Sequence, residues 1–156
     1  MTPRRHLLVV FHSQSGGAAA MGDAVVEGAR RPDIEGVDVR VRPALEADAS
    51  DVRWAEALVL GTPENFGYMS GAVKYFFDRV YYEVIDTARG LPYALFVKAG
   101  HDGAGAVSSV ERIVTGLAWR RVQPPLVVVG DLRDDPLDAC RDLGMTMAAS
   151  LDVGLL

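Results

Sequence analysis

Hydroxyl, amide and glycine residues cluster between His12 and Ala18, directly after the apolar run Leu7–Phe11. The start of a helix offers free backbone N–H groups and the positive end of a dipole, and glycine lets an anion approach the backbone. No Lys or Arg occurs between His6 and Gly28, so this segment cannot be a Walker A loop, which needs Gly-Lys-Ser/Thr. The segment is therefore typical of a cradle for one phosphomonoester. An ordinary strand-to-helix turn rich in Ser and Gly is the alternative.

A second candidate segment, Gly61–Gly71, places Phe66, Tyr68 and Met69 among turn-forming residues after an apolar run. Aromatic faces at the end of a strand can stack on a planar heterocycle, and Asn65 with backbone groups would meet the polar edge of that ring. The alternative is that these side chains form a satellite of the core.

A third segment, Lys98–Gly105, is rich in glycine and carries two basic side chains, Lys98 and His101. Its last part, Gly103–Ser108, is similar to G-x-G-x-x-G, but the final glycine is missing and no acidic residue ends a following strand about 20 residues on, so the dinucleotide-binding fingerprint fails. We expect these glycines to offer a ligand a flat stretch of backbone. Exposure to solvent is the alternative for both basic side chains.

The elements that must position these segments alternate along the chain. Four short apolar runs predict strands buried on both faces, at residues 7–11, 57–60, 93–97 and 126–129. Val37, Val39 and Val41 alternate with charged residues, which is typical of a strand at a sheet edge. Apolar residues three and four apart predict helices over residues 18–29, 73–84, 107–117 and 137–151.

Two helix starts carry cap signals. Ser70 can cap the helix whose apolar stripe begins at Val73, and Asp135 followed by Pro136 predicts the start of the last helix. Strand and helix alternation predicts a doubly wound α/β sandwich of three layers, with a five-stranded parallel sheet of order 2-1-3-4-5. Ligands bind such folds beyond the carboxyl ends of the strands, where the three segments would meet.

Composition restricts the class of protein. The 156 residues, 49% hydrophobic and 24% charged, predict one packed domain over residues 1–156 and exclude a disordered chain. The net charge is −5 and neither half of the chain is basic, so nucleic acid is not an expected partner. Apolar runs of about five residues are too short to span a bilayer, and we expect a soluble cytoplasmic protein. The single cysteine, Cys140, cannot form an intrachain disulfide, and with three His it makes no zinc site, so no metal is expected.

Two of the segments resemble a known family. Ser13–Ala18 resembles the flavodoxin phosphate loop, and Gly61–Gly71 is similar to the G-T-P-x-x-F-G-x-M-S-G segment of the flavodoxin-like NAD(P)H:quinone oxidoreductases. The resemblance spans nearly the whole chain and implies the cofactor FMN, with its phosphate in the first segment and its ring between the other two. The residues expected to contact FMN are Ser13, Gln14, Ser15, Gly16, Gly17, Ala18, Pro63, Glu64, Asn65, Phe66, Gly67, Lys98, Ala99, Gly100, His101, Asp102 and Gly103.

The chain also departs from that family. The third segment is commonly T-G-x-G-G-G there, whereas Ala99–Gly105 has other residues and no hydroxyl side chain that could contact the ring. The insertion that the quinone oxidoreductases carry near their fifth strand is missing, since Asp131–Asp135 leads straight to the last helix, and the family's tetramer therefore does not carry over. Tyr75, Arg79 and Tyr82 lie at helical spacing and suggest a homodimer, with an ordinary surface helix as the alternative.

The resemblance implies a reductase that passes two electrons from NADH or NADPH through FMN to a quinone or similar small acceptor. No side chain is assigned as a catalytic acid, base or nucleophile, and Lys98 or His101 near the ring would stabilise the negative charge of the reduced flavin. The alternatives are a flavodoxin-type electron carrier, which is usually more acidic around its flavin, and a module of the same fold without a cofactor.

Overall fold

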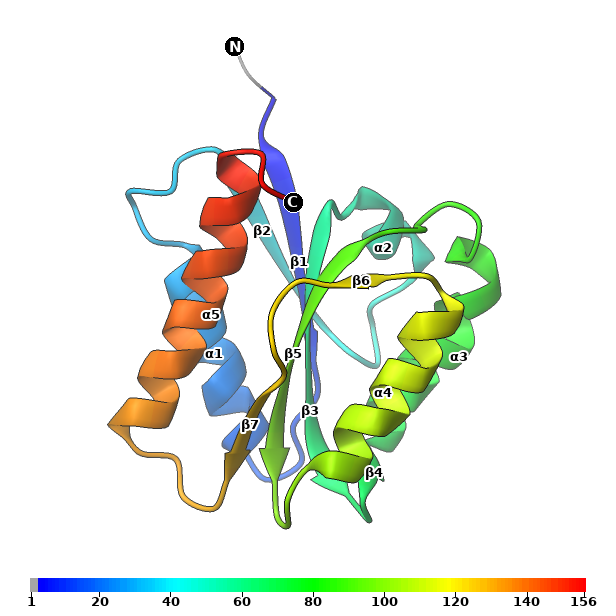
Figure 1. Cartoon of the computed structure of the whole chain (residues 1–156), viewed down its shortest axis with the longest axis vertical. Coiled ribbons are helices and arrows are strands. Elements are labelled where there is room, and N and C mark those ends of the chain that lie inside the picture. The colour runs from blue at the N-terminus through cyan, green and yellow to red at the C-terminus, as the bar shows by residue number, and fades with distance from the viewer. Residues whose placement is uncertain (1–2) are drawn as a thin grey trace.

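A parallel sheet with helices on both faces forms the molecule (Figure 1). The structure, a computed structural model, describes residues 3–156; Met1 and Thr2 of the predicted domain lie outside the described residues. The central strands are β2 (Val37–Pro43), β1 (Arg5–Phe11), β3 (Ala57–Asn65) and β5 (Pro92–Ala99), adjacent in that order and parallel.

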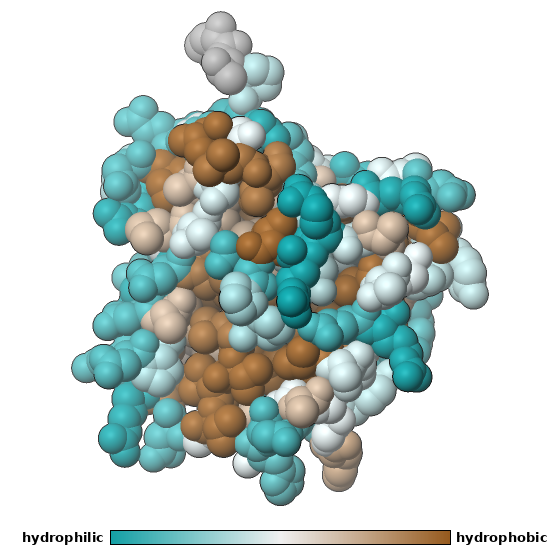
Figure 2. Space-filling model, in the orientation of Figure 1, coloured by the Kyte–Doolittle hydropathy of each residue, from teal (hydrophilic) through white to brown (hydrophobic). Residues whose placement is uncertain are grey.

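The last position in the sheet is shared by two short strands, β6 (Arg120–Arg121) and β7 (Leu126–Val129), which both pair with β5. Between them lie Pro124 and Pro125, which have no N–H to donate to the ladder. The predicted order 2-1-3-4-5 is confirmed, with a fifth strand in two pieces. Figure 2 shows hydrophobic surface gathered over β7 at this edge, where Val129 is 55% exposed.

The two faces of the sheet carry separate apolar clusters. Leu7 and Val9 of β1 point to α1 (Gly17–Ala29) and α5 (Asp134–Asp152), whereas Leu8 and Val10 point to the opposite face. The helices on that opposite face are α2 (Ala49–Trp54), α3 (Gly71–Val84) and α4 (Ala104–Gly116). The alternation along β1 is the period of a strand that is buried on both faces, and the three-layer sandwich follows from it.

The cap signals had different outcomes. Ser70 is the N-cap of α3, and its hydroxyl accepts from the backbone N–H of Val73 at 3.3 Å, as predicted. The predicted start of the last helix is wrong, because α5 begins at Asp134 with Arg133 as its N-cap. Pro136 is therefore the third helical residue, a place that costs nothing because the first N–H groups of a helix have no partner within the helix.

The sequence patterns missed three features of the backbone. Helix α2 has a capping box in which Asp48 and Asp51 each accept from the other's backbone N–H. Strands β3 and β5 continue past their apolar runs, so Gly61–Asn65 and Lys98–Ala99 are strand rather than loop. The short β4 (Tyr68–Met69) pairs back onto β3. Among residues 3–156 no helix combines the length and apolarity that a membrane span requires.

Candidate functional site

The three segments singled out by residue type meet at the carboxyl end of the sheet, where β1, β3 and β5 end beside one another. The first turns into α1 through Gly16, whose φ of 91° is a conformation that glycine adopts without strain. The hydroxyl of Ser13 accepts from the N–H of Gly16 at 2.9 Å, which closes this turn. The two segments from β1 and β3 are joined by the Asn65 amide, which donates to the Gln14 side-chain oxygen at 2.6 Å.

Helix α1 begins without a cap. No side chain of residues 3–156 caps its first N–H groups, and the N-cap residues of α4 and α5 also make no side-chain cap, whereas α2 and α3 are capped by Asp48 and Ser70. A β-carbon built on Gly16 would meet no heavy atom within 4 Å, so the space in front of this helix end is open. Ala18 is buried, so it can offer an anion its backbone N–H alone. Free donors, a dipole end and open space fit a phosphate group.

The second segment is a hairpin formed by β3 and β4. Its two turn residues, Phe66 and Gly67, have φ of 53° and 66°, as a type I′ turn requires. Phe66 is fully exposed and Tyr68 is 42% exposed, so neither aromatic side chain belongs to the core. Met69 is buried, so the alternative that these side chains belong to the core holds for Met69 alone.

Glu64 links the hairpin to the third segment. Its carboxylate accepts from the backbone N–H of His101 at 2.9 Å and of Gly103 at 3.0 Å. Asp102 accepts from the N–H of Ala104 at 3.0 Å and so supports the first turn of α4. The imidazole of His101 is on an exposed residue next to these contacts.

Gly103 and Gly105, which do not complete a dinucleotide-binding fingerprint, allow close packing of α4. A β-carbon on Gly105 would lie 1.8 Å from the carbonyl oxygen of Gly67, and one on Gly103 would lie 2.6 Å from Val127. Helix α4 therefore packs directly on the hairpin turn, and glycine at position 105 is what permits this approach. Gly100, by contrast, has open space where a side chain would be.

Lys98 lies within strand β5 and against helix α1, rather than in the loop that follows the apolar run. It is the seventh residue of β5, and its half-buried side chain runs against Gly17, the first residue of α1. The sequence does not show this contact, because the apolar run ends at Val97 and the residue pattern predicts a loop from Lys98 on. Its spacing of two residues from Phe96, which faces α1, was the available signal.

Comparison with known proteins gives a consistent family. Residues 11–132 match the family described as NADPH-dependent FMN reductase. A flavodoxin from Aquifex aeolicus is 34% identical over 158 residues, which cover 91% of this chain and 84% of that protein. An NAD(P)H dehydrogenase (quinone) from Acidithiobacillus ferrooxidans is 33% identical over 91 residues, which cover 47% of this chain and 46% of that protein.

Solved structures show the same fold. A flavodoxin from the domain Archaea superposes with a TM-score of 0.77 at 22% identity, covering 94% of this chain and 98% of that one. A flavodoxin, WrbA-like protein from Agrobacterium tumefaciens has a TM-score of 0.76 at 18% identity, covering 93% of this chain and 96% of that one. The fold is therefore flavodoxin-like.

Proposed function

Because the chain belongs to the NADPH-dependent FMN reductase family of flavodoxin-like proteins, we propose that it binds FMN and is an NAD(P)H-dependent reductase of a quinone or similar small acceptor. The observation that carries this proposal is the uncapped start of α1 beside an exposed aromatic hairpin, at one end of the sheet. One end of the site suits a phosphate and the other suits a flat ring.

At the phosphate end, the backbone of residues 13–18 supplies the donors. The first N–H groups of α1 have no side-chain acceptor among the described residues, and the open space at Gly16 lets a ligand oxygen come close. Ser13 holds the turn through Gly16, and Gln14 is fixed by Asn65. These contacts preorganise the donors, so that little ordering remains to be done when the ligand binds.

At the ring end, Pro63–Gly67 and Ala99–Gly103 would flank the flavin. FMN supplies the redox chemistry when bound, and the chain supplies binding, orientation and charge. The exposed aromatic faces of Phe66 and Tyr68 suit stacking contacts, and His101 adds a titratable side chain on the opposite flank. We assign no acid, base or nucleophile, and we propose His101 as a residue that tunes the flavin potential.

The site supports a second candidate, an electron carrier of the flavodoxin type. The relative from Aquifex aeolicus that covers most of this chain is named a flavodoxin, which favours this reading. The two carboxylates of the proposed ring end, Glu64 and Asp102, both accept hydrogen bonds from backbone N–H groups of residues 101–104, so this end is not strongly acidic. This modest charge is our reason for preferring the reductase.

Turnover measurements separate the two candidates. We expect the purified protein to be yellow, to release FMN on denaturation, and to oxidise NADH or NADPH in the presence of a quinone with ping-pong kinetics. No turnover, together with a stable one-electron-reduced flavin on reductive titration, would identify the carrier. A preparation that fails to bind added FMN would rule out both and leave a cofactor-free module.

The same experiment tests His101. His101→Ala should change the flavin midpoint potential and the turnover rate, and unchanged values of both would exclude the tuning role.

We also propose a homodimer through α3. Tyr75 is 50% exposed and Tyr82 is 85% exposed, which leaves two aromatic side chains on one helix facing solvent. Arg79 is already used within the chain, because it donates to the carbonyl of Ala44 at 2.9 Å and lies over the Tyr75 ring. Size-exclusion chromatography with light scattering measures the state directly, and Tyr82→Ser should shift a dimer toward monomer.

A further inference from the structure

The phosphate end of the site contains no Lys or Arg of its own. Residues 12–18 carry no Lys or Arg, and the first turn of α1 has no acidic residue. A bound phosphomonoester carries up to two negative charges, and helix N–H groups with a half-charge dipole balance only part of them. A cation from another element would complete the balance.

Strand β5 brings such a cation to this place. A β-carbon built on Gly17 would lie 3.1 Å from Cγ and 3.4 Å from Cε of Lys98. The aliphatic stem therefore passes directly against the first residue of α1, and the ammonium is one bond beyond Cε. The glycine at position 17 is what makes room for this stem.

The ammonium has no counter-ion within the chain. Among residues 3–156, no carboxylate oxygen lies within 4.0 Å of the Lys98 ammonium. Its hydrogen bond is a long one, 3.5 Å to the carbonyl of Ala99. A half-buried positive charge next to the positive end of α1 is unfavourable by itself and becomes favourable when an anion binds between them.

We propose that Lys98 neutralises the phosphate of the bound cofactor, a cation supplied by β5 to a phosphate loop that has no Lys or Arg. The inference rests on the proposed binding of FMN. It also replaces the expectation that Lys98 acts on the flavin ring. The consequence is specificity for a phosphorylated flavin over riboflavin, which has the same ring and no phosphate.

Flavin titrations of the full chain, freed of bound flavin, test this assignment. The variants are Lys98→Met, which keeps the stem and removes the charge, and Lys98→Arg, which keeps the charge. Lys74→Met is the matched control, because Lys74 lies on α3 with its side chain 40% exposed and paired with Asp78. The measured quantities are the dissociation constants of FMN and riboflavin by fluorescence quenching, and the competition of inorganic phosphate with FMN.

We expect Lys98→Met to weaken FMN binding about tenfold or more and to leave riboflavin binding unchanged, a loss of at least about 1.4 kcal/mol specific to the phosphate. Lys98→Arg should retain most of the affinity, phosphate should compete less well in Lys98→Met, and Lys74→Met should match the wild type.

Equal weakening of FMN and riboflavin, or no weakening of either, would overturn the assignment while the proposed function stands. A wild-type chain that binds neither flavin would overturn the proposed function, and this assignment with it. Urea denaturation of each variant checks that it is folded, and Lys98→Arg carries the test if Lys98→Met is not.

Discussion

The carboxylate of Glu64 accepts a hydrogen bond from the backbone N–H of Gly103 at 3.0 Å, across the gap between β3 and the start of α4. The second carboxylate oxygen accepts from His101 at 2.9 Å. Both flanks of the proposed ring end are thus held together by one side chain. Hydrogen bonds to a charged carboxylate are stronger than hydrogen bonds to a neutral acceptor. We therefore expect Glu64 to be the side chain that mainly braces the third segment, that is, holds it in place.

Removing this brace should loosen the third segment. We expect Glu64→Ala to increase hydrogen exchange at the amides of His101 and Gly103, and to weaken FMN binding about tenfold, because two hydrogen bonds to a charged group are lost at a partly exposed site. Hydrogen-exchange mass spectrometry and a flavin titration measure the two effects. Glu35→Ala, an exposed carboxylate between α1 and β2, is the control and should change neither. Unchanged exchange at residues 101–103 in Glu64→Ala would contradict the bracing role.

The arrangement of the strands was readable from residue patterns, and the contacts within the site were not. The alternation of Val37, Val39 and Val41 with charge placed β2 at the edge, and parallel pairing then placed three segments at one end of the sheet. The contact of Lys98 with Gly17 depends on how far β5 extends past its apolar run, which is decided by pairing with β3. The spacing of two residues from Phe96 indicates which face of the sheet Lys98 would occupy, but no local pattern shows that the strand extends as far as Lys98.

The same is true of Glu64 and Gly105. Glu64 finds its donors on a segment that is distant in sequence, and Gly105 is needed because the Gly67 carbonyl approaches it. A local signal exists where a side chain accepts from a backbone N–H group a few residues away. Ser70 gives such a signal for α3, and Asp48 with Asp51 gives one for α2.

Helices α1 and α5 should tolerate no side chain at their closest approach. A β-carbon on Gly144 would lie 1.9 Å from the carbonyl oxygen of Val25, and one on Gly28 would lie 1.9 Å from that of Arg141. Because backbone atoms block the space, Gly144→Ala must push the helices apart, and we expect a loss of about 2–3 kcal/mol in the free energy of unfolding, measured by urea denaturation.

Gly71→Ala is the matched control, since a β-carbon there meets nothing within 4 Å at the first residue of α3. That variant should be neutral or gain up to about 1 kcal/mol, because alanine favours a helix. Equal stabilities of the two variants would contradict the close packing of α1 on α5.

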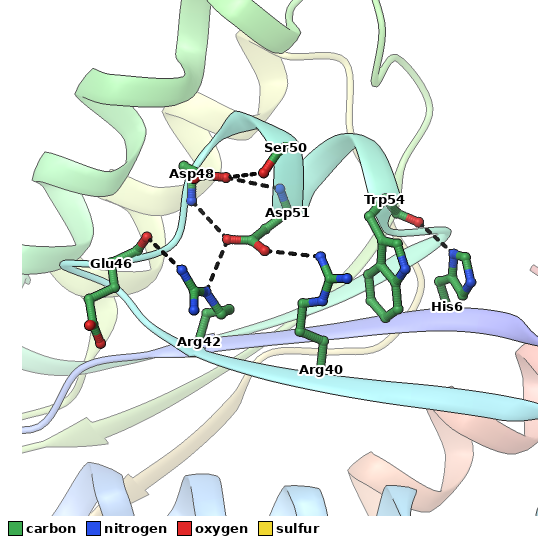
Figure 3. A network of polar contacts seen from close by, with 8 residues as sticks. All are labelled: His6, Arg40, Arg42, Glu46, Asp48, Ser50, Asp51 and Trp54. Carbon is green, nitrogen blue, oxygen red and sulfur yellow. Dashed lines mark hydrogen bonds and ion pairs between the residues drawn. The ribbon is translucent and has the colours of Figure 1, made fainter.

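Replacing the buried carboxylate of Asp51 should lower the stability of the fold more than replacing an exposed carboxylate. Its side chain is 7% exposed, and its oxygens accept from Arg40 at 3.1 Å, from Arg42 at 3.2 Å and from the N–H of Asp48 at 3.0 Å (Figure 3). Arg40 also lies over the ring of Trp54, 3.9 Å from its centroid. Removing the carboxylate leaves two guanidinium groups and a backbone donor without their acceptor.

We therefore expect Asp51→Ala to lower the free energy of unfolding by about 2–3 kcal/mol. Asp33→Ala is the control, because the Asp33 side chain is 67% exposed and its pair with Arg31 should contribute less than about 0.5 kcal/mol. Urea denaturation of both variants measures the difference, and a loss no larger in Asp51→Ala than in Asp33→Ala would show that the network stabilises nothing.

Cys140 should be inert in the folded chain and should make stability depend on pH in the alkaline range. It is fully buried in α5, and burial raises the pKa of its thiol from 9.0 to about 11. At pH 8 the thiolate fraction is then about 100-fold lower than for an exposed thiol, so Ellman's reagent should react slowly with the native protein and find one thiol per chain in denaturant.

The direction of the pH effect follows from the raised pKa of Cys140, because the folded state holds the thiol proton more tightly than the unfolded state. The contribution to stability is complete below pH 9 and is lost as the pH rises through about 11. Burial also raises the pKa of Tyr93, so part of the alkaline loss belongs to that residue. In Cys140→Ala, the loss of stability at alkaline pH that is due to Tyr93 should remain, and the loss that is due to the thiol should disappear. Urea denaturation at pH 8 to 11 measures both. An identical pH profile in wild type and Cys140→Ala would exclude the thiol as the cause.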